Sequence, residues 1–311
     1  MAASNMKAVK LRIKSVQNTM QITKAMQLVA ASKLRKAKEK ADHSKPYLNI
    51  LKSTLTDIAR ENNDFQSPYT KSGADENRWL YIVIAGDRGL AGGYNSNLFK
   101  FMEAERAGKD IDVLPVGKKA VEYFRRRGVN ILTEEYAEVA RISVSDSFGI
   151  AKLICNEFSA NHYGHVMLCY TDFVSMLSQI PRAISFLPLS DLLEHTLEWE
   201  EMNDDGKNSA AKKAAEDVAA SLEAKDLGVI LYEPDSESVF NTIVPEYLAG
   251  LVYTSVNISV ASELAARRTA MEAATDNAGE MIEKLSLYYN RARQASITQE
   301  ITEIVAGAEG Q

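Results

Sequence analysis

The chain has 311 residues, with 36 Lys and Arg against 42 Asp and Glu, and a formal net charge of −6. Hydrophobic residues make up 46% of it, enough for a full core and for long helices besides. No run approaches the roughly 18 consecutive apolar residues of a membrane span, and the first thirty residues hold no signal-peptide core. We therefore expect a cytosolic or peripheral protein built of two structural parts.

Residues 1–66 are predicted to form an N-terminal coiled-coil helix. Fifteen positions spaced alternately by three and four residues define one helix face, and all but three are apolar or alanine. Because this spacing keeps one face toward a partner helix, it predicts a seam of about seven heptads. The positions are Val9, Ile13, Val16, Met20, Thr23, Gln27, Ala30, Leu34, Ala37, Ala41, Ser44, Leu48, Leu51, Leu55 and Ile58.

The same arm is strongly basic. Residues 1–45 carry eleven Lys and Arg and two acidic residues, a net charge of +9 that leaves −15 for the remainder. The lysines and arginines between Lys33 and Lys40 could follow the phosphates of a nucleic acid or an anionic membrane, or simply face water. No aromatic residue precedes Tyr47, so base stacking has no platform. A basic coiled-coil protein that binds nucleic acid remains the alternative hypothesis.

Residues 67–235 are predicted to form a central α/β domain, entered through a turn-rich linker from Ser67 to Gly73. Apolar strand segments alternate there with amphipathic helix segments, which is typical of an open and mainly parallel, Rossmann-like sheet. The predicted strands are 79–85, 111–116, 129–136, 166–173 and 180–187, and the predicted helices are 96–105, 118–127 and 145–159.

A glycine loop, GDRGLAGGYN, follows the first strand. A strand, a glycine-rich turn and a helix start resemble a dinucleotide-binding turn, where backbone N–H groups hold phosphate. The spacing does not match GxGxxG, however, and the Gly-Lys pairs at Gly108, Gly117 and Gly206 are never followed by Ser or Thr. We interpret the glycines as a tight turn with close strand-to-helix packing. A dinucleotide enzyme with helical arms remains a third hypothesis.

Other catalytic or metal-binding arrangements are missing from the sequence. The four histidines form no HExxH motif, and there is no GxSxG motif. His162 and His165 could share a metal in principle, but they flank the start of a strand and more simply lie at the surface. Cys155 and Cys169 stand in apolar stretches without a CxxC pair, so we interpret both as buried free thiols. We predict no catalytic residues, no cofactor and no metal site.

Residues 236–311 are predicted to form a C-terminal coiled-coil helix, preceded by an alanine-rich, highly charged surface excursion at 195–226. The last 75 residues contain one proline, Pro245, and almost no turn signals, which is too long for a helix of an ordinary globular domain. Its predicted seam is rich in alanine, which allows close helix approach. The seam positions are Met271, Ala274, Ala278, Met281, Leu285, Tyr288, Ala292 and Ala295.

Both long helices carry a second apolar row beside the seam. In the first helix it is Ile22, Met26 and Val29, and the end of the last helix has Ile297, Ile301, Ile304 and Val305. A helix that is apolar on more than its partner-facing side requires further burial, which a two-stranded coil does not provide. The sequence therefore predicts that the coiled coil inserts into a surrounding protein sleeve.

Four segments resemble a known family, the γ subunits of F-type ATP synthases. RIKSVQNTMQITKAMQLVAASKLRKA (Arg12–Ala37) is similar to the family's N-terminal helix, and GDRGLAGGYN (Gly86–Asn95) to its central loop. AARRTAMEAATDNAGEMI (Ala265–Ile282) and NRARQASITQEITEIVAGA (Asn290–Ala308) resemble its C-terminal helix and signature. The resemblance covers nearly the whole chain in order, and the end motifs are highly specific. Ala91 replaces a frequent Cys, Gly310 departs from the signature, and the 195–226 segment is longer than usual.

The resemblance implies a long antiparallel coiled coil plus a central Rossmann-like α/β domain, acting as the rotor shaft of a proton-translocating F-type ATP synthase. The implied partners are three α and three β subunits, the ε subunit and the ring of c subunits, with no nucleic acid. Rotation of the c ring would turn the shaft and drive each catalytic β site through its states. Nucleotide chemistry would belong to β, so this chain would be non-catalytic.

The resemblance also implies a place and a contact surface. Membrane association would be indirect, through the complex, at the cytoplasmic face of the cell membrane. Rotor–stator contacts are expected from one group on each helix. They are Lys24 and Met26 on the first helix, and Arg293, Gln294, Thr298 and Glu303 on the last. Val29 is added from its position off the heptad row, on the face that has no partner within the chain.

Overall fold

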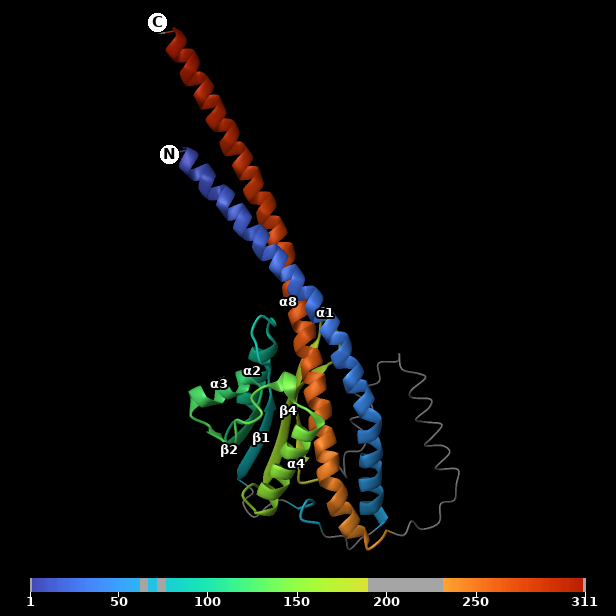
Figure 1. The fold of residues 1–311 in the computed structure, drawn as a ribbon. Helices are drawn as coiled ribbons and strands as arrows, with labels where there is room; N and C mark the ends of the chain where they lie inside the picture. Colours follow the sequence, from blue (N-terminus) through green and yellow to red (C-terminus); the bar gives the residue numbers. More distant parts are fainter. Residues whose placement is uncertain (1, 62–66, 72–76, 190–231, 310–311) are drawn as a thin grey trace. The chain divides into compact units, whose positions relative to one another are not determined.

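The computed structural model describes residues 2–61, 67–71, 77–189 and 232–309 (Figure 1). The chain divides into two compact units. The helical unit comprises Met1–Arg35, Leu90–Gly93 and Glu263–Gln311, and the α/β unit comprises Lys36–Gly89 and Tyr94–Ser262. The predicted excursion at 195–226 lies outside the described residues, and the domain boundaries at 66/67 and 235/236 stay a prediction.

The α/β unit is built on a five-stranded sheet in the order β3-β2-β1-β4-β5. The first four of these are parallel, and β5 runs antiparallel to β4 at the edge. The mainly parallel Rossmann-like sheet predicted from the sequence is confirmed, although the third strand has only two residues. The strands are β1 (Arg78–Ile84), β2 (Asp110–Val116), β3 (Asn130–Ile131), β4 (His165–Phe173) and β5 (Gln179–Leu187).

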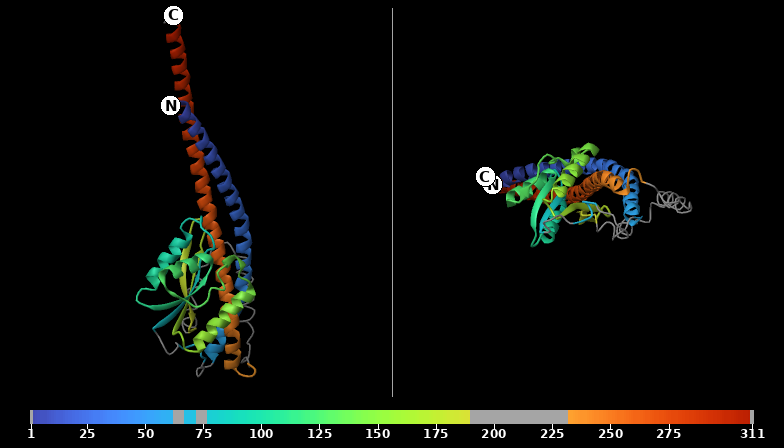
Figure 2. Two further views of the ribbon diagram at one scale, coloured as in Figure 1. Left: turned by 60° about the vertical axis from the view of Figure 1, so that its left-hand side comes forward. Right: turned by 90° about the horizontal axis from the view of Figure 1, so that it is seen from below.

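Helices cover both faces of this sheet (Figures 1 and 2). α2 (Tyr94–Glu105) and α3 (Lys118–Arg127) pack on the face that carries Tyr81, Val83 and Cys169. α4 (Val144–Ser159) and parts of the two long helices pack on the opposite face. Because β1 is buried on both sides, its sequence is a continuous apolar run instead of an alternating one.

Two helices dominate the rest of the chain: α1 (Ala2–Glu61) and α8 (Ser236–Glu309). All fifteen predicted seam positions of α1 are buried or half-buried. From Tyr247 to Ala265, α8 is buried on nearly every side, because it crosses the α/β unit as a core helix. This segment explains why α8 alone, among the described helices, is long and apolar enough to resemble a membrane span: 83% of its apolar window is buried within the protein.

The two long helices pair antiparallel, as predicted. In the helical unit the Thr23 and Thr275 hydroxyls lie 2.7 Å apart. In the α/β unit the Thr254 hydroxyl donates to that of Ser44 at 2.9 Å. In both pairs the residue numbers add to the same value, which is the signature of an antiparallel pair in one register. The two pairs are separated by three heptads on each helix.

The seam predicted for α8 is correct at five of its eight residues and wrong at three. Met271, Ala274, Ala278, Leu285 and Ala292 are buried or half-buried, but Met281, Tyr288 and Ala295 are exposed. Their neighbours take the inward positions, because the Thr23–Thr275 contact turns the helix by one residue from the predicted phase. The apolar pattern fits two phases of the helix here, because each mispredicted residue has an apolar or small neighbour. The half-buried neighbours are Ile282, Tyr289 and Ser296.

Candidate functional site

The exposed apolar rows of the helical unit are its most distinctive surface. On α1, Ile22 and Val29 are exposed, Val29 to 54%, whereas Met26 is half-buried beside the seam. Near the end of α8, the side chains of Ile297, Ile301, Ile304 and Val305 are all exposed. The sequence analysis missed Leu11 and Leu28 on α1 and Leu287 on α8, which are also exposed. Their apolar character is visible in the sequence, but they lie outside the two predicted apolar rows.

The predicted contact residues form two separate groups. Lys24, like Val29, is exposed on α1, and Arg293, Gln294 and Thr298 are exposed on α8. The register that pairs Thr23 with Thr275 puts Lys24 opposite Ala274, nineteen residues before Arg293, or roughly 28 Å along the helix axis. The helical unit therefore does not bring the two groups together. The side chain of Glu303 lies outside the described part of the chain.

The α8 segment that carries Arg293, Gln294 and Thr298 extends past the start of α1. In the same register, the first residues of α1 lie opposite Ser296, so Ile297 and the residues after it run beyond the helix pair (Figure 1). Within that segment the Thr298 hydroxyl donates to the Gln294 carbonyl at 2.9 Å. Because this bond uses the hydroxyl proton, Thr298 presents its methyl group and oxygen lone pairs outward.

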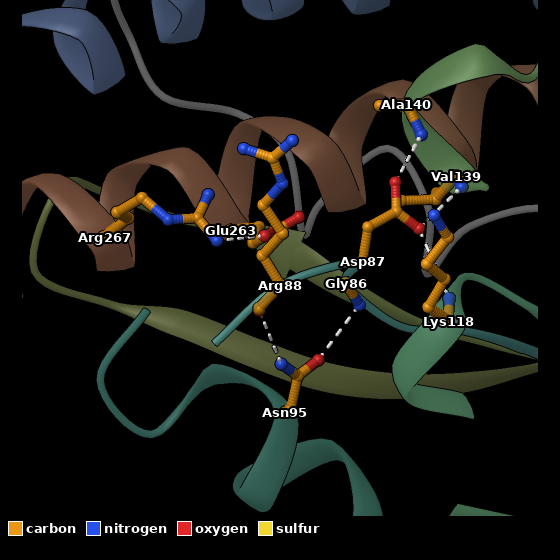
Figure 3. Close-up of polar contacts among 9 residues, drawn as sticks. All are labelled: Gly86, Asp87, Arg88, Asn95, Lys118, Val139, Ala140, Glu263 and Arg267. Carbon is orange, nitrogen blue, oxygen red and sulfur yellow. Dashed lines mark hydrogen bonds and ion pairs between the residues drawn. The ribbon is translucent and has the colours of Figure 1, made fainter. Parts of the chain in front are cut away.

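The glycine loop is held by its own side chains at the carboxyl edge of the sheet (Figure 3). The Asp87 carboxylate accepts from the backbone N–H groups of Lys118 (3.3 Å), Val139 (2.9 Å) and Ala140 (3.1 Å). The Asn95 side chain accepts from the Gly86 N–H at 2.9 Å. The Asp87 carboxylate thus joins the glycine loop to the first amide of α3 and to two amides at 139–140 within the same chain. The geometry supports the structural interpretation of the loop.

The tip of this loop belongs to the helical unit. A side chain at Gly92, which has a φ of +54°, would lie 3.7 Å from the Ala270 Cβ of α8, so the loop and the helix pack closely. Leu90 also has a positive φ of 63° and is exposed. A left-handed conformation is rare for a residue with a branched apolar side chain, so the backbone at Leu90 is strained.

The described residues contain no group of three or more His, Cys, Asp or Glu side chains that could hold a metal ion. His162 lies with its Nδ1 2.7 Å from the Glu157 carboxylate, and His165 stacks on Trp79 with ring centroids 4.2 Å apart. Both cysteines are buried free thiols, as predicted, and burial raises the pKa of Cys155 to about 11. Within the described chain, therefore, we find no constellation for catalysis.

The comparisons with known proteins agree over the full length of the chain. The family model described as ATP synthase matches residues 5–310. The ATP synthase gamma chain of Ruminococcus albus is 44% identical over 307 residues, covering 97% of this chain and 96% of that protein. The chain belongs to the ATP synthase gamma chain family. A gamma chain is a non-catalytic subunit of the synthase, which accords with the lack of a catalytic constellation in the described residues.

Other members and solved structures extend this likeness. The gamma chain of Acetobacterium woodii, named as sodium ion specific, is 38% identical and covers 99% of both chains. A chain of the Euglena gracilis mitochondrial ATP synthase, solved with OSCP, F1 and c-ring, has a TM-score of 0.61 at 17% identity. The match covers 99% of this chain and 95% of that one. At that identity it shows the gamma chain fold alone.

Proposed function

We propose that this chain is the central rotor shaft of a proton-translocating F-type ATP synthase, turning with the c ring and driving the catalytic β subunits through their states. The observation that carries the proposal is the antiparallel helix pair with exposed apolar rows on both helices. A shaft that turns inside a sleeve needs such a surface, because apolar contacts are non-directional and do not lock at one angle. Family membership supports the same function.

The proposed rotor–stator contacts are the two separate groups of the helical unit. Lys24, Met26 and Val29 would face β lever segments, and Arg293, Gln294, Thr298 and Glu303 would act further along α8. The cations supply long-range orientation toward acidic segments, while the apolar side chains supply the bearing surface. The α and β subunits, the ε subunit and the c ring are the proposed partners, at the cytoplasmic face of the cell membrane and bound to it only through the complex.

The choice of a proton as the coupling ion is a separate part of the proposal. One relative is named as sodium ion specific, whereas the more similar Ruminococcus albus protein carries no such name. The test is ATP-driven acidification of vesicles that contain the native complex, with and without added sodium. Acidification in sodium-free buffer supports the proton. Pumping that requires sodium would contradict it and leave the rotor proposal intact.

The bearing surface is tested by aspartate at Met26 or Val29. Each change places an anion on an apolar bearing and opposite acidic levers, and burying that anion unpaired costs several kcal/mol, on the order of 3. We expect lower yield of assembled complex or a lower ratio of ion pumping to ATP hydrolysis. Ile50→Asp is the matched control, because Ile50 is equally exposed on α1 but belongs to the α/β unit. Wild-type yield and pumping ratio in both variants would overturn the proposed surface.

A further inference from the structure

Strand β4 continues beyond the end of the strand that pairs with it on one side. Its pairing with β1 ends at Val83 and Cys169. On its other side, Thr171 lies opposite Pro181 of β5, which has no N–H to donate to the Thr171 carbonyl. Because Thr171 is buried, its own backbone N–H and C=O require partners within the protein.

Two serines of α8 supply these partners. The Thr171 N–H donates to the Ser259 hydroxyl at 3.2 Å, and the Ser262 hydroxyl donates to the Thr171 carbonyl at 3.0 Å. All three residues are buried and belong to the α/β unit. Since Ser259 and Ser262 are three residues apart, they lie on one face of the helix. The helix therefore takes the place at the edge of β4 that a further residue of β1 would take.

These two bonds are directional, unlike the apolar contacts of the same helix. Residues 247–262 of α8 contribute seven buried side chains to the hydrophobic core, whose attraction does not depend on angle. A serine oxygen lies about 5 Å from the helix axis, so a turn of α8 by about 20° would move it by roughly 2 Å. That movement takes a 3.0 Å hydrogen bond out of range. Close packing resists large displacements, and the two hydroxyls specify one angle of α8 against the sheet.

A third serine on α8 has the same burial without the bond. Ser255 precedes Ser259 by four residues, about one helical turn, and is fully buried. Within the described part of the chain its hydroxyl has no hydrogen-bond partner. Removing such a hydroxyl costs no hydrogen bond, whereas removing that of Ser259 leaves a buried N–H unsatisfied. Ser255 is therefore a matched control for Ser259.

We propose that Ser259 and Ser262 form a rotational clamp, two positioning residues that make α8 turn with the sheet of the α/β unit instead of twisting against it. The clamp rests on the proposed rotor function. Because α8 is one continuous helix from Ser236 to Glu309, the clamped segment is joined directly to the proposed stator contacts at 293–303. Torque applied to the α/β unit reaches those contacts through a helix whose angle to the sheet is fixed.

The hydrogen bonds are tested first, in the purified full-length chain. In Ser259→Ala the Thr171 amide loses its acceptor, so we expect its hydrogen exchange to accelerate roughly 2–10-fold, the equivalent of one hydrogen bond. Ser255→Ala should leave the exchange of Thr171 unchanged. Mass spectrometry with residue-level fragmentation measures both rates. Wild-type exchange at Thr171 in Ser259→Ala would overturn the clamp.

The mechanical role is tested in the assembled complex, with its catalytic sites held by a non-hydrolysable ATP analogue. A gold nanorod is attached to the α/β unit through Leu177→Cys, because Leu177 is 84% exposed and both native cysteines are buried. We expect the double variant Ser259→Ala and Ser262→Ala to broaden the angular distribution of the rod. Ser255→Ala should give the wild-type distribution.

Each remaining outcome is informative. Faster exchange at Thr171 with an unchanged rod distribution would show that the serines only stabilise the fold, and would overturn the clamp. So would equal broadening in the double variant and in Ser255→Ala. If the double variant does not assemble, Ser262→Ala alone, which keeps the Thr171 N–H bonded, is held to the same criterion. A wild-type complex whose rod never rotates with ATP would instead refute the rotor function and leave the exchange result intact.

Discussion

Gly117 lies between the ends of β1 and β2 and the start of α3. Its φ is +98°, and a side chain there would collide with the carbonyl oxygen of Ala85. The close approach allows the Lys119 N–H to donate to the Gly86 carbonyl at 3.0 Å, next to the amide that Asp87 binds. At the scale of single residues, then, close backbone packing and the Asp87 carboxylate shape the glycine loop region.

We predict that Gly117→Ala destabilises the α/β unit by about 2–5 kcal/mol, because it adds both backbone strain and a steric clash. Gly128→Ala is the matched control. Gly128 also has a positive φ, 66° at the C-terminus of α3, but a side chain there meets no described atom within 4 Å. It should lose only about 1–2 kcal/mol. Urea titration of both variants measures the difference, and equal losses would contradict the clash.

A second prediction at this scale concerns the thiols. Burial raises the pKa of both cysteines, and that of Cys155 to about 11, so at pH 8 almost none of either residue is thiolate. Iodoacetamide should therefore leave the folded chain unlabelled at pH 8, while both sites react after unfolding in urea. Mass spectrometry counts the labels. Rapid alkylation of Cys155 in the native state would show that it is accessible.

At the scale of elements, the two long helices differ in how well the heptad pattern predicts which residues face the partner helix. All fifteen predicted positions of the α1 seam are buried or half-buried, and many of them, such as Ile13, Val16 and Leu34, have polar neighbours on both sides, which favours one phase. In α8 the pairs Ala274/Thr275, Met281/Ile282 and Tyr288/Tyr289 have similar apolarity, and the pattern alone cannot choose between them. The structure adopts the phase in which the Thr23 and Thr275 hydroxyls meet across the helix pair.

The register of the pair can be measured with cysteines. In the double variant Thr23→Cys and Thr275→Cys, the two sulfurs replace hydroxyls that lie 2.7 Å apart, so we expect rapid disulfide formation under mild oxidation. The control, Thr23→Cys with Ile282→Cys, is one heptad out of register and should stay reduced. Electrophoretic mobility separates the cross-linked chain. A disulfide in the control, or none in the first variant, would refute the register.

At the scale of the whole molecule, the distribution of charge and apolar surface separates the two units. The first 35 residues, all within the helical unit, contain seven Lys and Arg and no acidic residue. The α/β unit instead pairs much of its surface charge internally. On and around α3, Lys118 pairs with Glu138 at 2.7 Å, Lys119 with Glu122 at 2.7 Å and Arg127 with Glu103 at 3.0 Å. The positive charge of the first 35 residues is partly offset within the helical unit itself, because residues 263–311 hold five Lys and Arg against eight Asp and Glu.

We predict that the purified chain alone does not hydrolyse ATP. The sequence has no phosphate loop, and the side chains of Asp87 and Asn95 in the glycine-loop region are hydrogen-bonded to backbone amides of the chain itself. Phosphate release is measured across successive purification steps that remove β subunits, with the intact complex as the positive control. Turnover that stays with the chain after β is gone would contradict this prediction.

Taken by itself, the sequence determined the two long helices, the mainly parallel sheet, the buried thiols and the exposed apolar rows. These follow from periodicity and local chemistry, which act over a few residues at a time. Tertiary structure decided the rest. It set the phase of the α8 seam through a contact between residues 252 positions apart, and it gave the glycine loop its Asp87 anchor 52 residues from Val139. Such contacts depend on how distant segments pack, and local sequence patterns carry no information about that packing.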